Sequence, residues 1–268
     1  MKITDCHAHI FPSKIAEKAS VGIGDFYDTK MRYLGDCEHL LESGSKAGIS
    51  RYWVHSVATT PAQVRTINDF IAQQCEIHPE FVGFGTIHPG ADVEAELDHL
   101  VELGLCGVKI HPDFQKFRID DKEALAIYDY IAGKLPLIVH TGDYRYEFSQ
   151  PQRMAKVLDM FPRLDCIGAH FGGWSVWDDA YEHLGSRRCW VDTSSTFGFI
   201  ENPEHVKDLV DKWGTERMLF GSDFPMWDHS DELRHVTSLG LSDAQLEAVL
   251  DGNAEALLRS GSINYKAN

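Results

Sequence analysis

The sequence lacks the features that mark secreted, membrane-spanning and disulfide-rich proteins. Its six cysteines form no CxxC pair, and no apolar run approaches the ~20 residues that cross a bilayer. The N-terminus has no basic region followed by an apolar block, so we expect no signal peptide. These absences predict a cytoplasmic protein whose cysteines are reduced and pack as small hydrophobic side chains.

Basic residues are also scarce. The chain has 25 Lys and Arg residues against 41 Asp and Glu residues, which gives a formal net charge of -16 at pH 7. Nucleic acids and anionic membrane surfaces are bound by clustered basic residues, so we expect neither as a partner. A small-molecule substrate is the favoured ligand, and a homo-oligomer is left open.

The chain is long enough, at 268 residues, for one large α/β domain, and no shift in composition marks a second. We therefore treat residues 1–268 as a single domain. Short apolar or β-branched segments alternate along it with amphipathic segments. The eight predicted strands are Ile3 to Ile10, Arg51 to Val57, Phe81 to Ile87, Cys106 to His111, Leu137 to Thr141, Asp165 to His170, Arg188 to Thr193 and Arg217 to Gly221.

Strict alternation of strand and helix predicts parallel strands joined by right-handed crossovers, and eight such units can close into a (β/α)8 barrel. An open doubly wound sheet is the alternative, but no Gly-rich phosphate-binding loop follows an early strand. Helix starts are marked at Thr60-Pro61 with Gln63, at Asp120 with Glu123, and at Ser149 ahead of Pro151.

Two segments outside this alternation carry their own predictions. Ser242 to Leu258 predicts two short C-terminal helices on the barrel exterior, the first opened by a capping box from Ser242 to Gln245. Phe11 to Leu34 is the longest segment without clear periodicity. In a barrel it would stand on the catalytic face, where we expect either an ordinary loop or a lid over the site.

Two histidines stand close together in the first predicted strand, within Asp5-Cys6-His7-Ala8-His9. Because side chains alternate along a strand, Asp5, His7 and His9 should share one face while Cys6 and Ala8 occupy the other. The two imidazoles indicate half of a transition-metal site, with Asp5 supporting the ligands from behind. Two solvent-facing histidines on an edge strand are the alternative.

Further polar residues recur at the ends of the predicted strands, where barrel enzymes place their active sites. Imidazoles from several strands, with an acidic group after the last one, indicate a shared site rather than chance. These residues are His55, His88, Lys109, His111, His140, His170, Asp192 and Asp223.

Five segments together resemble the amidohydrolase superfamily, specifically the amidohydrolase-2 group of metal-dependent TIM-barrel hydrolases and decarboxylases. The resemblance extends as far as Gly252-Asn253-Ala254 and implies a single α/β TIM barrel. The segments are Asp5 to His9 (DCHAH), Gly107 to Pro112 (GVKIHP), Val139 to Gly142 (VHTG), Gly168 to Gly173 (GAHFGG) and Gly221 to Pro225 (GSDFP).

The resemblance implies a divalent metal, with Zn²⁺ expected and one ion favoured over two. His7, His9, His140 and Asp223 look like its ligands, and an open position would hold a catalytic water. Asp223 would also take the proton of that water and pass it to the leaving group. His170 matches a histidine that, in this superfamily, either binds a second metal or polarises the substrate and moves protons.

Lys109 has two interpretations. In some branches of the superfamily a lysine at this position is carboxylated and bridges two metals. We favour a plain ammonium that binds a substrate anion or pairs with a nearby acid, with His111 pointing inward beside it toward the substrate. For His55 and His88 we expect hydrogen-bonded core or rim residues, and surface positions for His39, His78, His99, His183, His205, His229 and His235.

Aromatic residues and one arginine follow the later predicted strands. We expect Tyr144, Arg145 and Trp174 to contact the substrate, since aromatic walls with a guanidinium suit a small molecule with a flat part and a carboxylate. The alternative is that about half of these aromatic residues only pack loops onto the barrel rim.

Three functions are compatible with this site. The leading hypothesis is a metal-dependent hydrolase of an amide, lactone or other ester-like bond in a small carboxylated molecule, with His170 and Lys109 stabilising oxyanion charge. The second is a metal-dependent nonoxidative decarboxylase of a small carboxylic acid, with aromatic acids among the candidates. The third is a catalytically silent barrel that only binds a metal or a ligand.

Overall fold

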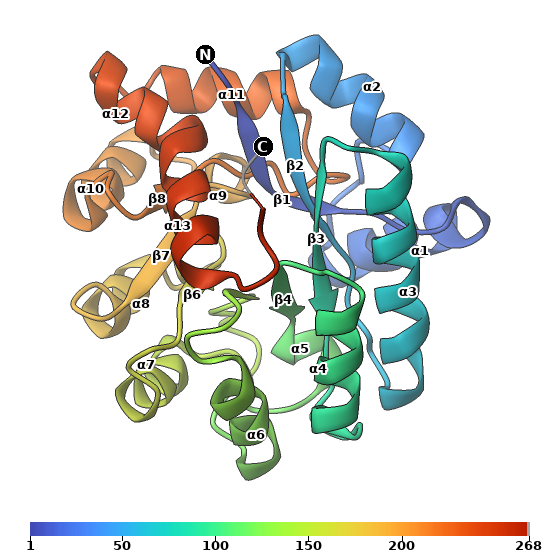
Figure 1. Cartoon of the computed structure of the whole chain (residues 1–268). Coiled ribbons are helices and arrows are strands. Elements are labelled where there is room, and N and C mark those ends of the chain that lie inside the picture. The colour runs from blue at the N-terminus through green and yellow to red at the C-terminus, as the bar shows by residue number, and fades with distance from the viewer. Residues whose placement is uncertain (267–268) are drawn as a thin grey trace.

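The computed structural model describes residues 1–266 and contains a barrel of parallel strands surrounded by helices (Figure 1). Each strand pairs in parallel with the next in the order β1 to β8, so the predicted (β/α)8 architecture is confirmed. Within residues 1–266, no helix is both long and apolar enough to cross a membrane. The strands are β1 (Thr4–His9), β2 (Arg51–His55), β3 (Phe81–Thr86), β4 (Gly107–Ile110), β5 (Leu137–Val139), β6 (Cys166–Gly168), β7 (Cys189–Asp192) and β8 (Met218–Leu219).

Backbone hydrogen bonds join the first strand to the last and close the barrel. The Cys6 amide donates to the Phe220 carbonyl at 2.8 Å, and the His9 amide donates to the Phe224 carbonyl at 2.8 Å. In return, the Asp223 amide donates to the His7 carbonyl at 2.9 Å. The two ends of the sheet therefore meet at the residues that the sequence marks as metal ligands.

The helices follow the strands in the expected order, but two predicted starts are off by one residue. The capping boxes at Thr60 and Ser242 are confirmed. Asp121, not Asp120, precedes α6, and Gln150, not Ser149, precedes α7. The helices are α1 (Ser13–Tyr27), α2 (Cys37–Ala47), η1 (Pro61–Gln63), α3 (Val64–Ile77), α4 (Val93–Glu102), α5 (Pro112–Gln115), α6 (Lys122–Ile131), α7 (Pro151–Met160), α8 (Trp177–Leu184), α9 (Thr196–Phe199), α10 (Pro203–Trp213), α11 (His229–Thr237), α12 (Asp243–Glu247), η2 (Ala248–Gly252) and α13 (Asn253–Gly261).

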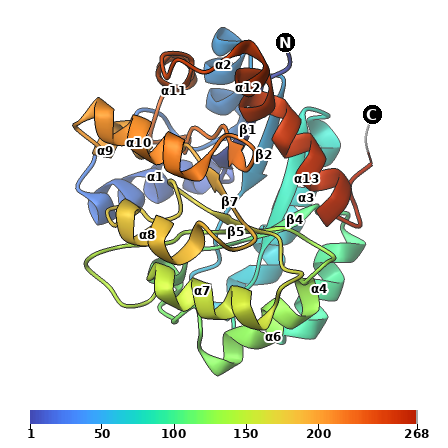
Figure 2. The same cartoon turned by 90° about the vertical axis from the view of Figure 1, so that its left-hand side faces the viewer.

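The segment Phe11 to Leu34 contains a regular helix, α1, where the sequence predicts an unstructured loop or lid. Its buried positions are Ala16, Ser20 and Gly24, which recur every four residues but are small and weakly apolar. A search for apolar periodicity misses such a stripe. In Figure 2, α1 lies at one end of the barrel and α13 at the other.

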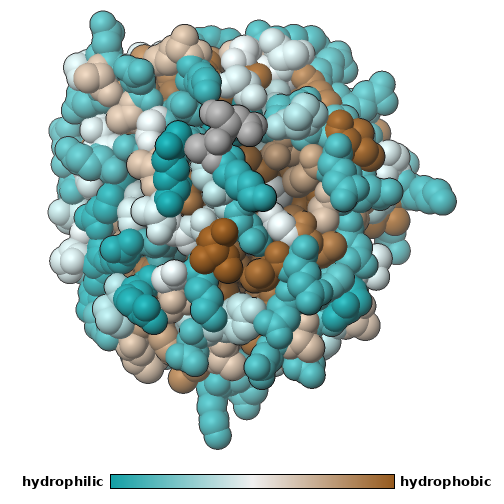
Figure 3. Space-filling view, in the orientation of Figure 1, coloured by the Kyte–Doolittle hydropathy of each residue, from teal (hydrophilic) through white to brown (hydrophobic). Residues whose placement is uncertain are grey.

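The C-terminal helices lie elsewhere than predicted. Instead of packing around the barrel, α13 lies across its end (Figure 1), and Figure 3 shows this face as mostly hydrophilic with a hydrophobic patch near its centre. Ala254, Leu257 and Leu258 pack against side chains that converge from the strands inside the barrel. The interior side chains are Cys6, Trp53, Val82, Phe84, Cys106, Ile138, Ile167 and Leu219. The polar site can therefore form only at the other end.

The packing of β4 against this interior layer gives a stability prediction. A Cβ atom built at Gly107 lies 2.1 Å from Cε1 of Phe84. We expect Gly107→Ala to lower the free energy of unfolding by about 1–3 kcal/mol, the usual cost of an overpacked core. Urea denaturation followed by circular dichroism measures this change.

The matched control is Gly22→Ala in α1, where a new Cβ meets no atom of the described residues within 4 Å. This substitution should leave the stability unchanged or raise it by up to about 1 kcal/mol, since alanine is the better helix former. Equal unfolding midpoints for Gly107→Ala and the parent protein would contradict the packing argument.

Candidate active site

The carboxyl ends of the strands enclose a small cavity. Its volume is about 20 Å³, enough for one water molecule or ion. Ile23 and Tyr27 of α1 and Met31 just after it also line the cavity, so α1 takes part in closing the site. The polar residues that line the cavity are His7, His9, Lys109, His111, His140, His170 and Asp223, all of which the sequence brought into the predicted site.

A bulge in β1 overturns the predicted alternation of its side chains. The pairing with β2 shifts between Asp5 and Ala8. Cys6 packs inside the barrel, and His7 and His9 line the cavity with ring centroids 5.3 Å apart. Asp5 does not share their surroundings, because two successive residues at a bulge can face the same side of a strand.

The buried Asp5 carboxylate instead ties β1 to the turn after β8. Its Oδ1 accepts hydrogen bonds from the amides of His7 (3.0 Å) and Ser222 (2.9 Å). Its Oδ2 accepts from the Ser222 hydroxyl (2.6 Å) and lies 3.0 Å from Nε2 of His229. Asp5 therefore supports the candidate ligands through the backbone rather than through their rings.

Asp223 approaches the two histidines of β1 directly. Its Oδ1 lies 3.5 Å from Nε2 of His7 and 3.4 Å from Nε2 of His9, while the Ser195 hydroxyl donates to Oδ2. The backbone of Asp223 has a φ of 57°, a conformation that L-residues rarely adopt and that often marks functional turns. Burial alone would raise the pKa of Asp223, but the neighbouring histidines hold it well below its usual range.

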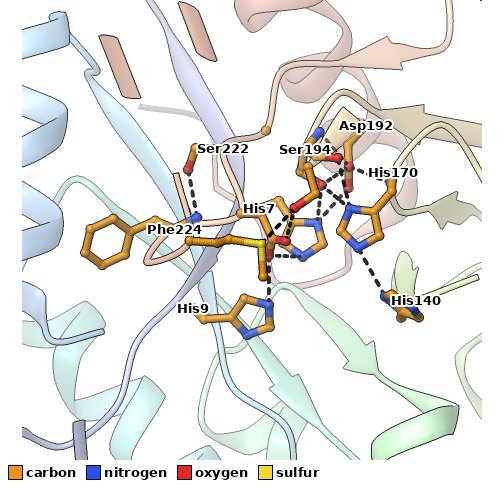
Figure 4. Close-up of polar contacts among 12 residues, drawn as sticks. His7, His9, His140, His170, Asp192, Ser194, Ser222 and Phe224 are labelled. Atoms are coloured by element: carbon orange, nitrogen blue, oxygen red, sulfur yellow. Dashed lines mark hydrogen bonds and ion pairs between the residues drawn. The ribbon is translucent and has the colours of Figure 1, made fainter. Parts of the chain in front are cut away.

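Asp192 and Ser194 form a second layer to which the sequence assigned no role. Asp192 Oδ2 lies 2.8 Å from Nδ1 of His7, and its Oδ1 accepts from the amides of His170 (3.0 Å) and Ser194 (3.2 Å) (Figure 4). Burial alone would raise the pKa of Asp192, but the charges and hydrogen bonds of His7 and His170 hold it at about 2. The available signal was an acidic residue at the end of β7.

His170 and His140 face each other across the site. His170 Nδ1 donates to the Ser194 carbonyl at 3.0 Å, and its Nε2 lies 3.1 Å from Nδ1 of His140 (Figure 4). Burial lowers the pKa of His170 to about 4 and does the same for His9. These rings are therefore neutral at pH 7, and a neutral imidazole is the form that binds metals.

The phenol of Tyr27 lies between two further imidazoles. Its hydroxyl is 2.8 Å from Nε2 of His111 and 3.4 Å from Nε2 of His140. His111 Nδ1 accepts the Phe114 amide at 3.3 Å, so the proton of a neutral His111 ring sits on Nε2 and points at the phenol. The ring of Tyr27 also contacts Trp174 at a centroid distance of 5.0 Å.

Lys109 is buried among these groups, with its Nζ 3.0 Å from Nε2 of His7. Burial lowers the pKa of the Lys109 ammonium to about 8, while the carboxylates of Asp192 and Asp223 act in the opposite direction. The side chain therefore carries a positive charge for most of the time at pH 7. It lies where both predicted roles, the anion-binding ammonium and the carboxylated ligand, require it.

The donor set fits a divalent metal. Ligand atoms of His7, His9 and His55 lie within 4.8 Å of one another, as imidazoles around one ion do. Both ring nitrogens of His55 are buried and lack a hydrogen-bond partner within residues 1–266. The prediction of a hydrogen-bonded His55 is therefore wrong, and two buried imidazole nitrogens without a partner suit a metal ligand.

Two other histidine predictions have different outcomes. His229, expected at the surface, is fully buried between Asp5 and Ser43, whose hydroxyl lies 2.8 Å from its Nδ1. The sequence places it in a loop after the last strand and gives no sign that α2 packs over it. His88 is a half-buried rim residue whose Nδ1 accepts the Gly90 amide, as predicted.

The predicted substrate contacts are distributed unevenly. Trp174 is buried beside the site, whereas Tyr144 is 72% exposed and does not line the cavity. Arg145 pairs with Asp143 at 2.7 Å, donates to the Phe26 carbonyl, and stacks over the rings of Tyr27 and Trp174. Arg145 therefore clamps the C-terminal end of α1 against the barrel rim.

Comparison with solved structures finds the same fold at low sequence identity. A TIM-barrel protein of Bordetella bronchiseptica, described as uncharacterized, is 18% identical with a TM-score of 0.79 over 97% of this chain and 99% of its own. A 2,6-dihydroxybenzoate decarboxylase in complex with 2,6-dihydroxybenzoate is 18% identical with a TM-score of 0.75 over the same shares. A dihydroxybenzoic acid decarboxylase from Polaromonas, with manganese and the inhibitor 2-nitroresorcinol, is 16% identical with a TM-score of 0.74 over 96% and 97%.

The sequence itself matches a family model. The model described as Amidohydrolase (Amidohydro_2) covers residues 4–260, from the start of β1 to the last turn of α13. It thus includes every strand and every candidate ligand. Because the match spans nearly the whole chain, this protein belongs to the amidohydrolase family, in its Amidohydro_2 group.

Proposed function

We propose that this enzyme is a metal-dependent nonoxidative decarboxylase of a small hydroxylated aromatic carboxylic acid. The sequence favoured a hydrolase, but two of the similar structures described above are decarboxylases of dihydroxybenzoic acids, which supports the alternative reaction. Membership of an enzyme family also argues against a silent barrel. The type of reaction then depends on which substrate the cavity can bind.

The observation that carries this proposal is the phenol of Tyr27. A hydroxylated ring already occupies the site, with its oxygen between Nε2 of His111 and Nε2 of His140 and the ring in a T-shaped contact with Trp174. Hydrogen-bond donors and aromatic walls that hold one phenol can hold another. A substrate phenol would take the same partners once Tyr27 has left.

His7, His9, His140 and Asp223 would hold the metal. A carboxylate-containing, nitrogen-rich set suits zinc or manganese; zinc is the expectation from the sequence, and manganese is the ion in one similar decarboxylase. When bound, the ion would supply positive charge that holds the substrate carboxylate and an adjacent hydroxyl. Lys109, buried within hydrogen-bonding distance of His7, would add its ammonium to the same anion.

The residues of the chain can then move one proton without an oxidant. Asp223, an acceptor beside His7 and His9, takes the proton of the substrate hydroxyl and delivers it to the ring carbon that bears the carboxylate. The carbon–carbon bond breaks, its electron pair returns to the ring, and CO₂ leaves. The phenolate regains a proton from water, while the Nε2–H of His111 stabilises its oxygen.

Substrate entry requires α1 to move. The cavity of about 20 Å³ is far too small for an aromatic acid, and Tyr27 fills the space beside it. Two polar contacts hold the end of α1, from the Tyr27 hydroxyl to His111 and from the Arg145 guanidinium to the Phe26 carbonyl. The rings of Phe26 and Tyr27 also pack against Phe114 and Trp174, and these contacts would have to break for the helix to move. The sequence predicts either a loop or a lid for this segment, and we propose that α1 is the lid.

The first prediction concerns the product. Purified enzyme loaded with Zn²⁺ or Mn²⁺ should release CO₂ from benzoates that carry a hydroxyl next to the carboxylate, and the chelated enzyme should not. Benzoate without the hydroxyl is the matched control, which should not react because it lacks the proton-donating phenol. Turnover of lactones or N-acyl compounds without CO₂ release would establish the hydrolase instead.

The second prediction concerns the proton carrier. Asp223→Asn keeps the size of the side chain but removes its basicity, so kcat should fall at least about 100-fold, as for loss of a general acid–base group. The melting temperature should stay close to that of the parent, because Asp5 holds the turn through Ser222. A rate like that of the parent would exclude Asp223 from catalysis.

The third prediction concerns Tyr27. Tyr27→Phe removes the hydroxyl that competes for His111, so KM should fall about 2–10-fold, the worth of one hydrogen bond, with kcat little changed. Tyr130→Phe, whose hydroxyl binds Asp98 outside the site, is the control and should leave KM unchanged. A higher KM for Tyr27→Phe would mean that the phenol contacts the substrate instead of giving way to it.

A further inference from the structure

Asp113 is a buried carboxylate without a hydrogen-bond partner. It lies in the first turn of α5, directly after β4, and is 4% exposed. Within residues 1–266, neither of its side-chain oxygens accepts a hydrogen bond. An isolated buried carboxylate is costly, so its presence calls for a partner that forms in another state of the protein.

Two groups act on the Asp113 carboxyl from nearby, the hydroxyl of Ser149 and the ring of His140. Asp113 Oδ2 lies 3.8 Å from Nε2 of His140, beyond hydrogen-bond length but within reach of a small rotation. The opposite nitrogen of the same ring, Nδ1, lies 3.1 Å from His170 (Figure 4). His140 therefore presents one nitrogen to the imidazole cluster and the other to Asp113.

This orientation of the His140 ring indicates how Asp113 can support metal binding. An imidazole that ligates a metal through one nitrogen carries its proton on the other, and that N–H usually donates to a carboxylate or carbonyl. In the metal-free protein the contact with Nε2 of His170 places the proton of His140 on Nδ1. With Nδ1 as the ligand atom, the proton must instead sit on Nε2. Tyr27 is the other acceptor near Nε2, at 3.4 Å, but its hydroxyl is engaged with His111 and leaves with α1 in the proposed function.

A second metal site at His111, Asp113 and His140 is the competing interpretation, since their ligand atoms lie within 4.8 Å of one another. The rings of His111 and His140 are stacked, with centroids 3.9 Å apart and an interplanar angle of 9°. Their in-plane lone pairs run parallel and do not converge on one ion. His111 also carries its proton on Nε2, because Nδ1 accepts the Phe114 amide. The three residues are therefore a poor chelate.

We propose that Asp113 is a positioning residue. Its carboxylate accepts a hydrogen bond from the protonated Nε2 of His140 and so orients that ring for metal binding. The inference rests on the metal site of the proposed function but not on the reaction. Loss of an outer-layer carboxylate of this kind weakens metal binding by about 10–100-fold. In the metal-free protein, the same loss removes a buried carboxyl group whose oxygens have no hydrogen-bond partner among residues 1–266.

The test is metal affinity, measured on the full chain with Zn²⁺ and Mn²⁺ by competition against a chromophoric chelator. Asp113→Leu should weaken binding about 10–100-fold, and Asp113→Asn, which keeps an acceptor oxygen, should weaken it less. The melting temperature of metal-free Asp113→Leu should not fall below that of the parent. Glu232→Gln, which alters an equally buried acid in α11, is the matched control and should leave the affinity unchanged.

A double-mutant cycle with His140→Ala tests whether Asp113 acts through that ring. In the His140→Ala background, Asp113→Leu should change the affinity by less than about twofold, because residues that act as a unit are not additive. An undiminished effect there, or tight binding by Asp113→Leu alone, would overturn the inference. So would loss of one of two bound ions, which would make Asp113 a ligand. A parent protein that binds no metal would instead defeat the proposed function.

Discussion

The candidate site depends on the hydrogen bonds that the Asp5 carboxylate accepts. Its oxygens hold the amides of His7 and Ser222 and the ring of His229, so one buried side chain fixes the first strand, the turn after the last strand and the start of α11. The seam between β1 and β8 is also where the barrel closes. Because His7 and Asp223 lie on either side of that seam, closing the fold and assembling the ligand set are one event.

This assembly concentrates imidazoles in a space where burial disfavours the charged forms of His9 and His170. Burial lowers the pKa values of His9 and His170 to about 4 and leaves the nitrogens of His55 without partners among residues 1–266. Asp192 offsets part of the cost by binding His7 and the backbone of His170. A metal-binding cavity requires such a cluster of metal-ligand atoms, held together by the rest of the protein. Binding of an ion would stabilise the folded chain by mass action.

The sequence predicted the barrel and most of the polar cavity lining because both depend on patterns that repeat. Alternating strands and helices mark the architecture, and polar residues at strand ends mark the catalytic face. It failed where one residue breaks a pattern or where a contact joins distant segments. The bulge in β1 moves Asp5 away from its predicted face, α2 buries His229, and α1 packs through Ala16, Ser20 and Gly24, whose small side chains carry almost no hydrophobic signal.

The charges near the cavity explain the different roles of the strands and of α1. A formal charge of -16 repels carboxylates, but salt screens charges beyond about 8 Å at physiological ionic strength. The groups at the cavity therefore decide whether an anion binds. Arg145 is neutralised by Asp143 and serves to hold α1, which leaves Lys109 as the buried cation beside the ligands. In the proposed function, an aromatic acid would meet this attractive charge only after α1 has moved, so the helix that closes the site would also delay the interaction that draws the substrate in.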